Sequence, residues 1–406
     1  YGYRERDYLN PNNFNYIPEK RRQVNDLLGK MKRQIKDNAV NHTATKHYIN
    51  NYGSVLQTFA SQQYLASFGY DCSVINYTRE NATKEGVYRE FYKIYRNCND
   101  LRALPIFSYL LAKRAEIRFI KKSILFDSFR KKFLKLTKTV NKDELYTFFC
   151  NPALYIVGSD QTWNYDYNGG FLPEYYLSFV KDGVKISLSS SIGNEHFNKL
   201  EQNEVKKYLK DFQFITVREK SAVNALNEIG IMNAQQVLDP TLLLSRNNWI
   251  KAMNLVDETE DYILVYQLNH NMMLSDFASN LSKKTDLKIV RIHTFDFKDN
   301  IKSKKNITPE KFCQLFLSAK YIVTDSFHGT AFSINFNRKF FVFQPPKYST
   351  RIKSILELCN MKDRLLNTTN VDDNIINNEI DYTRINKILE KERFKVNDLM
   401  NSLTGD

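Results

Sequence analysis

The chain has 406 residues, which suits two domains of about 150–200 residues better than one. Hydrophobic residues make up 42% and aromatic residues 14%, so the composition excludes wholesale disorder, and no apolar run reaches the roughly 18 residues that a membrane-spanning helix needs. The net charge of +14 lies mainly in residues 1–38 (9 basic, 5 acidic) and 84–148 (16 basic, 7 acidic), which indicates an anionic partner such as nucleic acid, an anionic membrane surface or a phosphorylated substrate.

The five cysteines form neither a metal-binding pattern nor a disulfide framework. They are Cys72, Cys98, Cys150, Cys313 and Cys359. No pair has Cys-x-x-Cys spacing and none has a histidine at metal-ligand spacing, so we expect structural thiols, a reducing compartment and no metal. The first residues are polar where a secretory signal would be apolar, which also favours a cytoplasmic protein.

Short apolar strands alternate with helices from about residue 39, after an irregular lead-in and a charged arm. The first half predicts strands at 40–47, 72–77, 154–157, 184–188 and 212–217. Helices are expected at 18–37, 55–66, 199–210 and 219–229, and residues 84–148 interrupt the alternation with long, basic, aromatic-rich helices.

The chain turns at residues 238–241 and the alternation restarts. The second half predicts strands at 262–267, 288–292, 321–324 and 340–343 and helices at 274–281, 309–318, 330–335, 351–358 and 380–403.

This alternation is typical of parallel sheets, so the sequence predicts an α/β protein of two Rossmann-like domains with a cleft between them. The predicted segments are a basic N-terminal arm at 1–38, a first domain at 39–240 with a helical basic insertion at 84–148, a second domain at 241–379, and a C-terminal helix at 380–406 that can cross back to the first domain.

Ligands of open parallel sheets bind at the carboxyl ends of the strands, which directs attention to the turns there. In Asn51-Tyr52-Gly53-Ser54 the glycine either lets backbone N–H groups approach an anion or makes a plain tight turn. Residues 158–164 (GSDQTWN) combine hydrogen-bonding groups with Trp163, which suits a sugar; the alternative is a cap for the next helix.

Cationic side chains follow three other strands. Arg218 comes after strand 212–217 and can bind phosphate or carboxylate, or form an ion pair at a helix start. His328 lies between a buried strand and a helix, where it can contact phosphate, act as an acid or base, or cap the helix. With Lys347 and Arg351 after the next strand, these residues predict a site for a small, multiply charged anion.

Taken in order, these motifs resemble those of the polysaccharide pyruvyl transferase family. The matching elements are residues 51–57 (NYGSVLQ), 158–164 (GSDQTWN), 189–193 (SSSIG), 218–220 (REK), 239–241 (DPT), 325–330 (DSFHGT) and 351–364. The resemblance covers about residues 39–366. The strand near 39–47 is more polar than is usual in the family, and residues 1–38 have no counterpart there.

The resemblance implies a GT-B-like arrangement and the transfer of pyruvate from phosphoenolpyruvate onto two hydroxyls of a hexose, as a ketal, during bacterial (for example capsular) polysaccharide biosynthesis. Phosphoenolpyruvate is a co-substrate, and no metal or cofactor is expected. The implied catalytic residues are His328, as general acid or phosphate binder, and Asp160, as base or hydroxyl orienter. The expected donor-binding residues are Arg218, Lys347, Arg351, Ser326 and Gly329, and the expected acceptor-binding residues are Asn51, Tyr52, Gly53, Ser159, Gln161, Trp163 and Asn164.

Two other functions stay open at this point. One is a GT-B glycosyltransferase that uses a nucleotide sugar, since the same architecture serves both. The other is a non-catalytic saccharide- or anion-binding protein with nucleic-acid-binding arms, although the sequence contains no recognisable nucleic-acid motif.

The basic segment 84–148 interleaves Lys and Arg with Phe, Tyr, Leu and Ile, as in residues 117–133 (IRFIKKSILFDSFRKKF). Such a surface suits anionic lipid, and the cations expected to contact it are Lys121, Lys122, Arg130, Lys131 and Lys132. The hypothesis is peripheral contact with the inner face of the plasma membrane, where a polyprenyl-diphosphate-linked saccharide is presented; the alternative is a solvated helical face.

Overall fold

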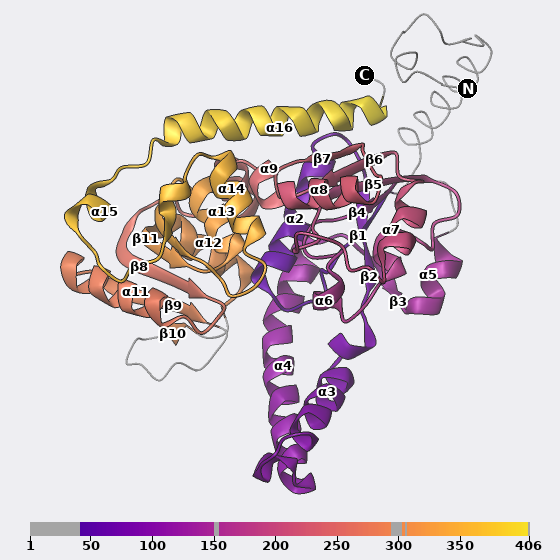
Figure 1. The fold of residues 1–406 in the computed structure, drawn as a ribbon, viewed down its shortest axis with the longest axis horizontal. Helices are drawn as coiled ribbons and strands as arrows, with labels where there is room; N and C mark the ends of the chain where they lie inside the picture. Colours follow the sequence, from indigo (N-terminus) through magenta and orange to yellow (C-terminus); the bar gives the residue numbers. More distant parts are fainter. Residues whose placement is uncertain (1–40, 150–153, 294–302, 305–306, 405–406) are drawn as a thin grey trace, which may run out of the picture.

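The computed structural model describes residues 41–149, 154–293, 303–304 and 307–404, and the arm at 1–38 lies outside them. Two parallel sheets are each covered by helices (Figure 1). The first contains β1 (Asn41–Ala44), β2 (Cys72–Tyr77), β3 (Leu136–Val140), β4 (Leu154–Val157), β5 (Val184–Ser190), β6 (Phe214–Val217) and β7 (Ala234–Gln236). The second contains β8 (Glu260–Gln267), β9 (Lys288–His293), β10 (Ser303–Lys304), β11 (Ala319–Thr324), β12 (Lys339–Phe343) and β13 (Leu365–Leu366).

Both sheets have the same strand order. The first runs β3-β2-β1-β4-β5-β6-β7 and the second β10-β9-β8-β11-β12-β13, with all pairs parallel. This is the doubly wound order of Rossmann folds, in which the order reverses between β1 and β4 and between β8 and β11. The chain is thus an α/β protein of two Rossmann-like domains in a GT-B-like arrangement.

The helices lie largely where the sequence predicts them. They are α2 (Tyr52–Ala66), α3 (Lys84–Arg96), α4 (Pro105–Phe133), α5 (Lys142–Phe148), α6 (Tyr165–Asn168), α7 (Gln202–Leu209), α8 (Lys220–Glu228), α9 (Pro240–Leu243), α10 (Arg246–Met253), α11 (Met272–Thr285), α12 (Pro309–Ser318), α13 (Phe327–Asn335), α14 (Thr350–Leu358), α15 (Asp373–Asn377) and α16 (Tyr382–Thr404). The helix expected at 18–37 lies outside the described residues.

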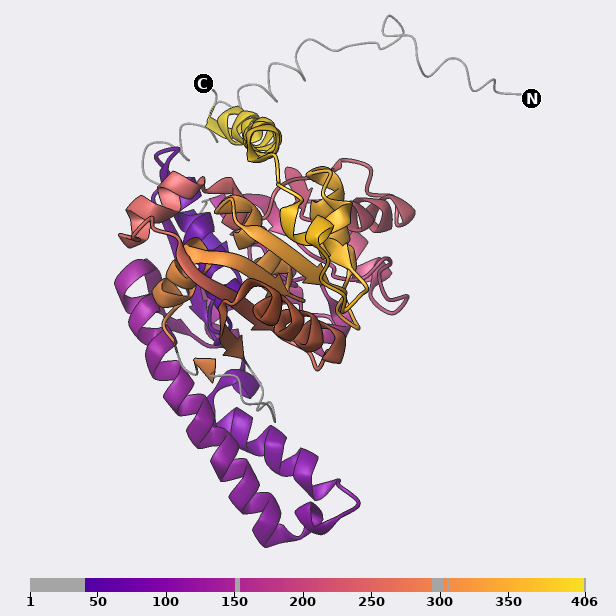
Figure 2. The same ribbon diagram turned by 90° about the vertical axis from the view of Figure 1, so that its left-hand side faces the viewer.

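The helical insertion predicted at 84–148 contains the helices α3, α4 and α5 but also a strand that the sequence analysis missed. Only α3 and α4 form a helical hairpin, which projects away from both sheets (Figures 1 and 2). After it, Leu136–Val140 forms β3 and pairs with β2 at the edge of the first sheet. An edge strand is only partly buried, so its sequence LTKTV is polar and resembles the basic residues around it. Only its β-branched Thr and Val residues indicate a strand.

Contacts at the start of α2 and along α16 are among those that join the two domains. Near the start of α2, Tyr52 stacks on Phe312 of the second domain, with ring centroids 4.5 Å apart, and its hydroxyl donates to the Ile307 carbonyl at 3.0 Å. Helix α16 crosses the joint from the second domain to the first (Figure 1): Tyr64 of α2 donates to Asn397 at 2.8 Å. Within the described residues, no helix combines the length and the apolar character that crossing a bilayer requires.

Candidate active site

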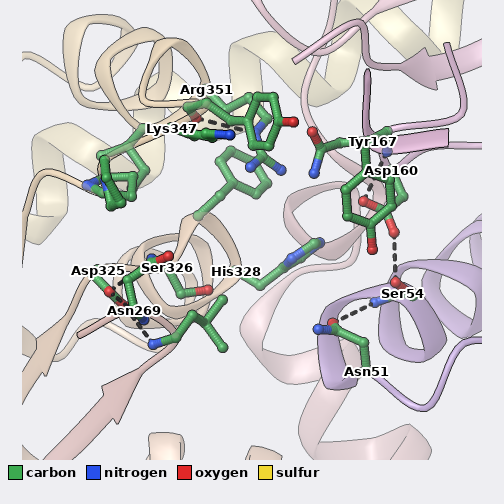
Figure 3. A pocket seen from close by; sticks show the side chains of 17 residues that line it. Asn51, Ser54, Asp160, Tyr167, Asn269, Asp325, Ser326, His328, Lys347 and Arg351 are labelled. Atoms are coloured by element: carbon green, nitrogen blue, oxygen red, sulfur yellow. Dashed lines mark hydrogen bonds between the residues drawn. The ribbon is translucent and has the colours of Figure 1, made fainter. Parts of the chain in front are cut away.

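A cavity of about 450 Å³ lies where the carboxyl ends of the two sheets face each other (Figure 3). Its walls come from the turns after β4, β8, β11 and β12 and from the start of α2. The lining includes Asn51, Ser54, Asp160, Gln161 and Tyr167 from the first domain, and Asn269, Asp325, Ser326, His328, Lys347 and Arg351 from the second. The cavity therefore occupies the point of each sheet where the strand order reverses, as expected of a ligand site in this fold.

His328 lies in the first turn of α13 and its ring is directed across the cavity toward Ser54 and Asp160 (Figure 3). The side chain is buried, and its Nε2 has no hydrogen-bond partner among the described residues. Burial lowers the pKa of His328 to about 4, an effect that nearby arginines reinforce and nearby aspartates oppose. The imidazole is therefore neutral at pH 7, and one of its nitrogens has no partner among the described residues.

Gly53 makes room for this ring. A Cβ atom at position 53 would lie 2.1 Å from Nδ1 of His328 and 2.5 Å from its Cε1. The backbone of Gly53 has no positive φ, so the glycine is required by the close approach and not by backbone strain. The acceptor-binding role predicted for Gly53 does not follow from this position; the residue instead allows the histidine from the other domain to reach the cavity.

Asp160 faces His328 from the first domain, in a left-handed backbone conformation with φ of 76°. Its carboxylate accepts hydrogen bonds from the Ser54 hydroxyl at 2.5 Å and from the Gln161 N–H at 2.8 Å. Burial alone would raise the pKa of Asp160, but the positive charge of Lys46 leads the effects that outweigh it, and the pKa lies well below its usual range. Asp160 is therefore ionised and able to accept a hydrogen bond.

Lys46 is a residue that the sequence reasoning missed. It follows β1, and its ammonium group donates to the Gln161 carbonyl at 2.6 Å and to Asn168 at 2.5 Å, and lies 4.3 Å from the centre of the Tyr167 ring. Burial lowers the pKa of Lys46 to about 7, while Asp160 acts in the opposite direction. Lys46 was missed because the strand was predicted at 40–47, which includes it, whereas β1 ends at Ala44 and leaves the lysine just after the strand.

Arg351 and Lys347 line the second-domain side of the cavity. Burial lowers the pKa of Arg351 to about 10, so the guanidinium is still charged at neutral pH. Its Nε donates to the Tyr348 carbonyl at 3.4 Å, and among the described residues no carboxylate lies within ion-pair distance of it. Lys347 is exposed beside it. The structure thus brings together three of the four cationic residues predicted to meet here, counting His328.

Arg218, the fourth, lies behind the cavity and does not line it. Its Nη1 donates to Asp239 at 2.8 Å, and its guanidinium lies 4.3 Å from the centre of the Phe327 ring. The side chain is only 1% exposed. The donor contact of Arg218 stays a prediction, because its Nε and Nη2 are buried without a hydrogen-bond partner among the described residues; its charge also acts on His328 and Asp160.

Most of the expected acceptor residues have structural contacts. Trp163 is 1% exposed, stacks on Tyr176 and donates its Nε1 hydrogen to the Tyr175 carbonyl at 2.8 Å, so it cannot stack on a sugar in the cavity. Asn164 caps α6, and the Ser159 hydroxyl donates to Asp239 at 2.8 Å.

Asn51 and Gln161 do line the cavity, whereas Tyr52 packs at the domain joint. Gly329, expected at the donor, packs against its own domain: a Cβ there would lie 2.3 Å from Oγ1 of Thr324. Among the first-domain residues that line the cavity, Asn51, Ser54 and Gln161 are therefore the candidates for contact with an acceptor.

The local electrostatics favour an anion. Helices α2, α13 and α14 begin at the cavity, and the N-terminus of a helix carries partial positive charge. The carboxylate of Asp325 is already engaged: it accepts from the Leu268 N–H at 2.7 Å and the Asn269 N–H at 2.9 Å, which braces the loop after β8. What remains open to a ligand is therefore mainly cationic or hydrogen-bond donating.

Three comparisons relate this chain to known proteins. The family model described as polysaccharide pyruvyl transferase matches residues 51–345. The search of curated proteins found no match. Similar solved structures include UDP-GlcNAc 2-epimerase from Methanocaldococcus jannaschii (12% identity, 86% of this chain and 91% of that one, TM-score 0.41) and Arabidopsis thaliana UGT89C1 complexed with UDP-L-rhamnose (9%, 91% and 100%, 0.42). E. coli heptosyltransferase WaaC is a third (9%, 78% and 99%, 0.37). Because the family model covers most of the chain and contains the turns after β4, β8 and β11 that line the cavity, this protein belongs to the polysaccharide pyruvyl transferase family.

Proposed function

We propose that this protein transfers pyruvate from phosphoenolpyruvate onto two hydroxyls of a hexose and so forms a ketal during bacterial, for example capsular, polysaccharide biosynthesis. The family supports a transferase that acts on polysaccharide. The observation that carries the choice of donor is the cavity itself, in which Arg351, Lys347 and His328 surround the start of α13. Phosphoenolpyruvate presents a carboxylate and a phosphate close together, and such a cluster of cations and helix N–H groups is complementary to both.

His328 gains a role when the donor binds. Among the protein's own groups, burial keeps the imidazole neutral, with a pKa of about 4. A bound phosphate and carboxylate would stabilise the charged imidazolium, so the histidine takes up a proton together with the donor. It can then pass this proton to the methylene carbon, which becomes a methyl group and leaves the neighbouring carbon with oxocarbenium character.

The remaining bonds follow from Asp160 and the acceptor. The ionised carboxylate orients a sugar hydroxyl whose oxygen attacks the oxocarbenium carbon. The bond from this carbon to the phosphate oxygen then breaks, and the second hydroxyl closes the ketal. One hydroxyl proton replaces the one given to the methyl group, and the other leaves with the phosphate, so the reaction is balanced. In this scheme Arg351 and Lys347 stabilise the departing phosphate, and neither metal nor cofactor is required.

The acceptor that we propose is a saccharide linked to a polyprenyl diphosphate at the inner face of the plasma membrane. This places the protein in the cytoplasm and in contact with the membrane. The basic hairpin α3–α4, which extends away from the cavity-bearing domains, supports this location (Figure 2).

Phosphate release tests the function directly. The protein is mixed with phosphoenolpyruvate and soluble methyl glycosides of glucose, galactose and mannose, and inorganic phosphate and a pyruvyl ketal are measured together. We expect release that depends on a glycoside and is lost in His328→Asn, while thermal unfolding shows the variant folded. Stabilisation by a nucleotide sugar and not by phosphoenolpyruvate would replace the proposal with a glycosyltransferase, and unchanged release in His328→Asn would remove His328 from the mechanism.

A further inference from the structure

Helix α4 has an apolar stripe on the side that faces away from the protein. Ile106, Leu110, Ile117, Ile120 and Ile124 are 66%, 54%, 51%, 38% and 63% exposed. With Lys113 they follow spacings of 4, 3, 4, 3 and 4 residues, which keeps all six side chains within about 40° of one line along the helix.

The opposite side of α4 is already occupied. Its buried residues are Ser108, Ala112, Phe126, Phe129 and Arg130, about half a helical turn away from the stripe. This side packs against α3 and the first domain. Helix α3 reaches only the edge of the outward stripe, where Lys113 lies 4.8 Å from the centre of the Tyr88 ring, and the five apolar side chains of the stripe stay exposed.

The tip of the hairpin extends the apolar surface. Leu101, Leu104 and Phe107 are 72%, 47% and 44% exposed where α3 turns into α4. Scattered exposed apolar residues are ordinary on protein surfaces, but a continuous series on one projecting arm marks an interaction surface. Figure 2 shows that this arm lies outside the body that contains both sheets.

The positive charge of the hairpin indicates what kind of partner binds the stripe. Residues 84–133 carry 13 basic and 5 acidic side chains, a net charge of +8. The exposed Arg114, Arg118 and Lys121 border one side of the stripe. Two copies of such an arm would repel each other if they paired through this face, whereas an anionic bilayer offers hydrocarbon to the stripe and negative headgroups to its cationic border.

We propose that the outward face of the α3–α4 hairpin, built on Ile106, Leu110, Ile117, Ile120 and Ile124, binds the surface of an anionic lipid bilayer. The stripe lies at the boundary between headgroups and acyl chains, and the bordering cations contact the headgroups. Arg130 is not part of this surface, contrary to the prediction from the sequence: its Nε donates to the His47 carbonyl at 2.8 Å, and it secures the base of the hairpin to the first domain.

The role of this membrane binding, which is to bring the enzyme to a lipid-linked acceptor, rests on the proposed function. The binding itself is measured without any substrate. Full-length protein is sedimented with vesicles of phosphatidylcholine alone or with 30 mol % phosphatidylglycerol. We expect the protein to bind the anionic vesicles. The binding should weaken as salt is raised, because the Debye screening length falls from about 10 Å at 0.1 M to about 3 Å at 1 M.

The decisive variant is Ile106→Gln/Ile117→Gln/Ile124→Gln, and its matched control is Leu200→Gln/Met232→Gln/Phe394→Gln, which changes apolar residues outside the hairpin that are on average more exposed. We expect at least tenfold weaker partitioning for the first and no change for the second, with both folded by circular dichroism. Partitioning of the first variant equal to wild type, or wild-type binding indifferent to phosphatidylglycerol, would overturn the proposal.

A second measurement separates a lipid partner from a second copy of the chain. Light scattering without lipid should report the same molecular mass for wild type and for the Ile106→Gln/Ile117→Gln/Ile124→Gln variant. If wild type is a dimer and this variant a monomer, the stripe is instead a self-association surface. Phosphate release from phosphoenolpyruvate with a soluble glycoside should be the same in all three proteins. Loss of vesicle binding with intact release therefore concerns the surface alone, and absent release with intact vesicle binding concerns the proposed reaction alone.

Discussion

The contact between Gly53 and His328 offers the sharpest test of the site, because the two residues come from different domains. In Gly53→Ala the new methyl group would lie 2.1 Å from Nδ1, 2.5 Å from Cε1 and 2.6 Å from Cγ of the ring. Ordinary contact needs about 3.5 Å, so the ring or helix α2 must move by more than about 1 Å. His328 is buried, and the ring therefore cannot simply swing into solvent.

Two magnitudes follow from this clash. A displacement of about 1 Å at a catalytic group costs on the order of 10²-fold in rate. Overpacking costs about 1–3 kcal/mol of stability, whereas alanine in place of glycine in a helix without a clash stabilises by up to about 1 kcal/mol. The sign of the change in unfolding free energy thus reports whether the contact exists.

The assay is phosphate release from phosphoenolpyruvate with a soluble glycoside, together with urea unfolding. We expect Gly53→Ala to lose about 10²-fold in kcat and to unfold at lower urea. Gln63→Ala, on the exposed side of the same helix, serves as the control and should change neither. A more stable Gly53→Ala protein with normal kcat would refute the geometry of the site.

Three further predictions concern charge. In Arg351→Leu the unpaired cation of the cavity is lost, and we expect KM for phosphoenolpyruvate to rise at least tenfold; an unchanged KM would exclude the donor contact. In Lys46→Met the pKa of Asp160 should rise, because the positive charge that chiefly holds it low is removed, so the acid limb of the kcat/KM profile should move to higher pH. His47 is buried with a pKa of about 4, below the unfolded value of about 6.5. Its contribution to the unfolding free energy therefore falls as pH drops from 7 to 4, by up to about 3 kcal/mol. In urea unfolding, His47→Gln should make the unfolding free energy depend less steeply on pH over this range.

The central strands, most of the longer helices, the α/β fold with two Rossmann-like domains and the family were readable from the sequence. Central strands of parallel sheets are buried on both faces, so runs such as LYIV at 154–157 and YILVYQ at 262–267 are apolar throughout and stand out locally. The edge strand Leu136–Val140 was missed for the opposite reason, since its exposed side carries polar residues.

The site residues divide in the same way. A position after a buried strand brought His328, Asp160 and Arg351 to the same cavity, because the carboxyl ends of parallel strands gather at one edge. Position alone could not tell which side chains point into the cavity. Trp163 and Arg218 satisfy the same criterion, yet they are buried behind it in contacts with residues distant in the sequence.

What the sequence by itself determined is therefore the architecture, the family and the edge of the sheets at which the cavity lies, since these depend on local periodicity and on a rule that holds for every parallel sheet. Only the tertiary structure decided that Gly53 makes room for His328, that Lys46 lies beside Asp160, and that α4 is apolar on two opposite sides. These facts depend on which face of each element another element covers. That is a property of long-range packing, and no local pattern encodes it.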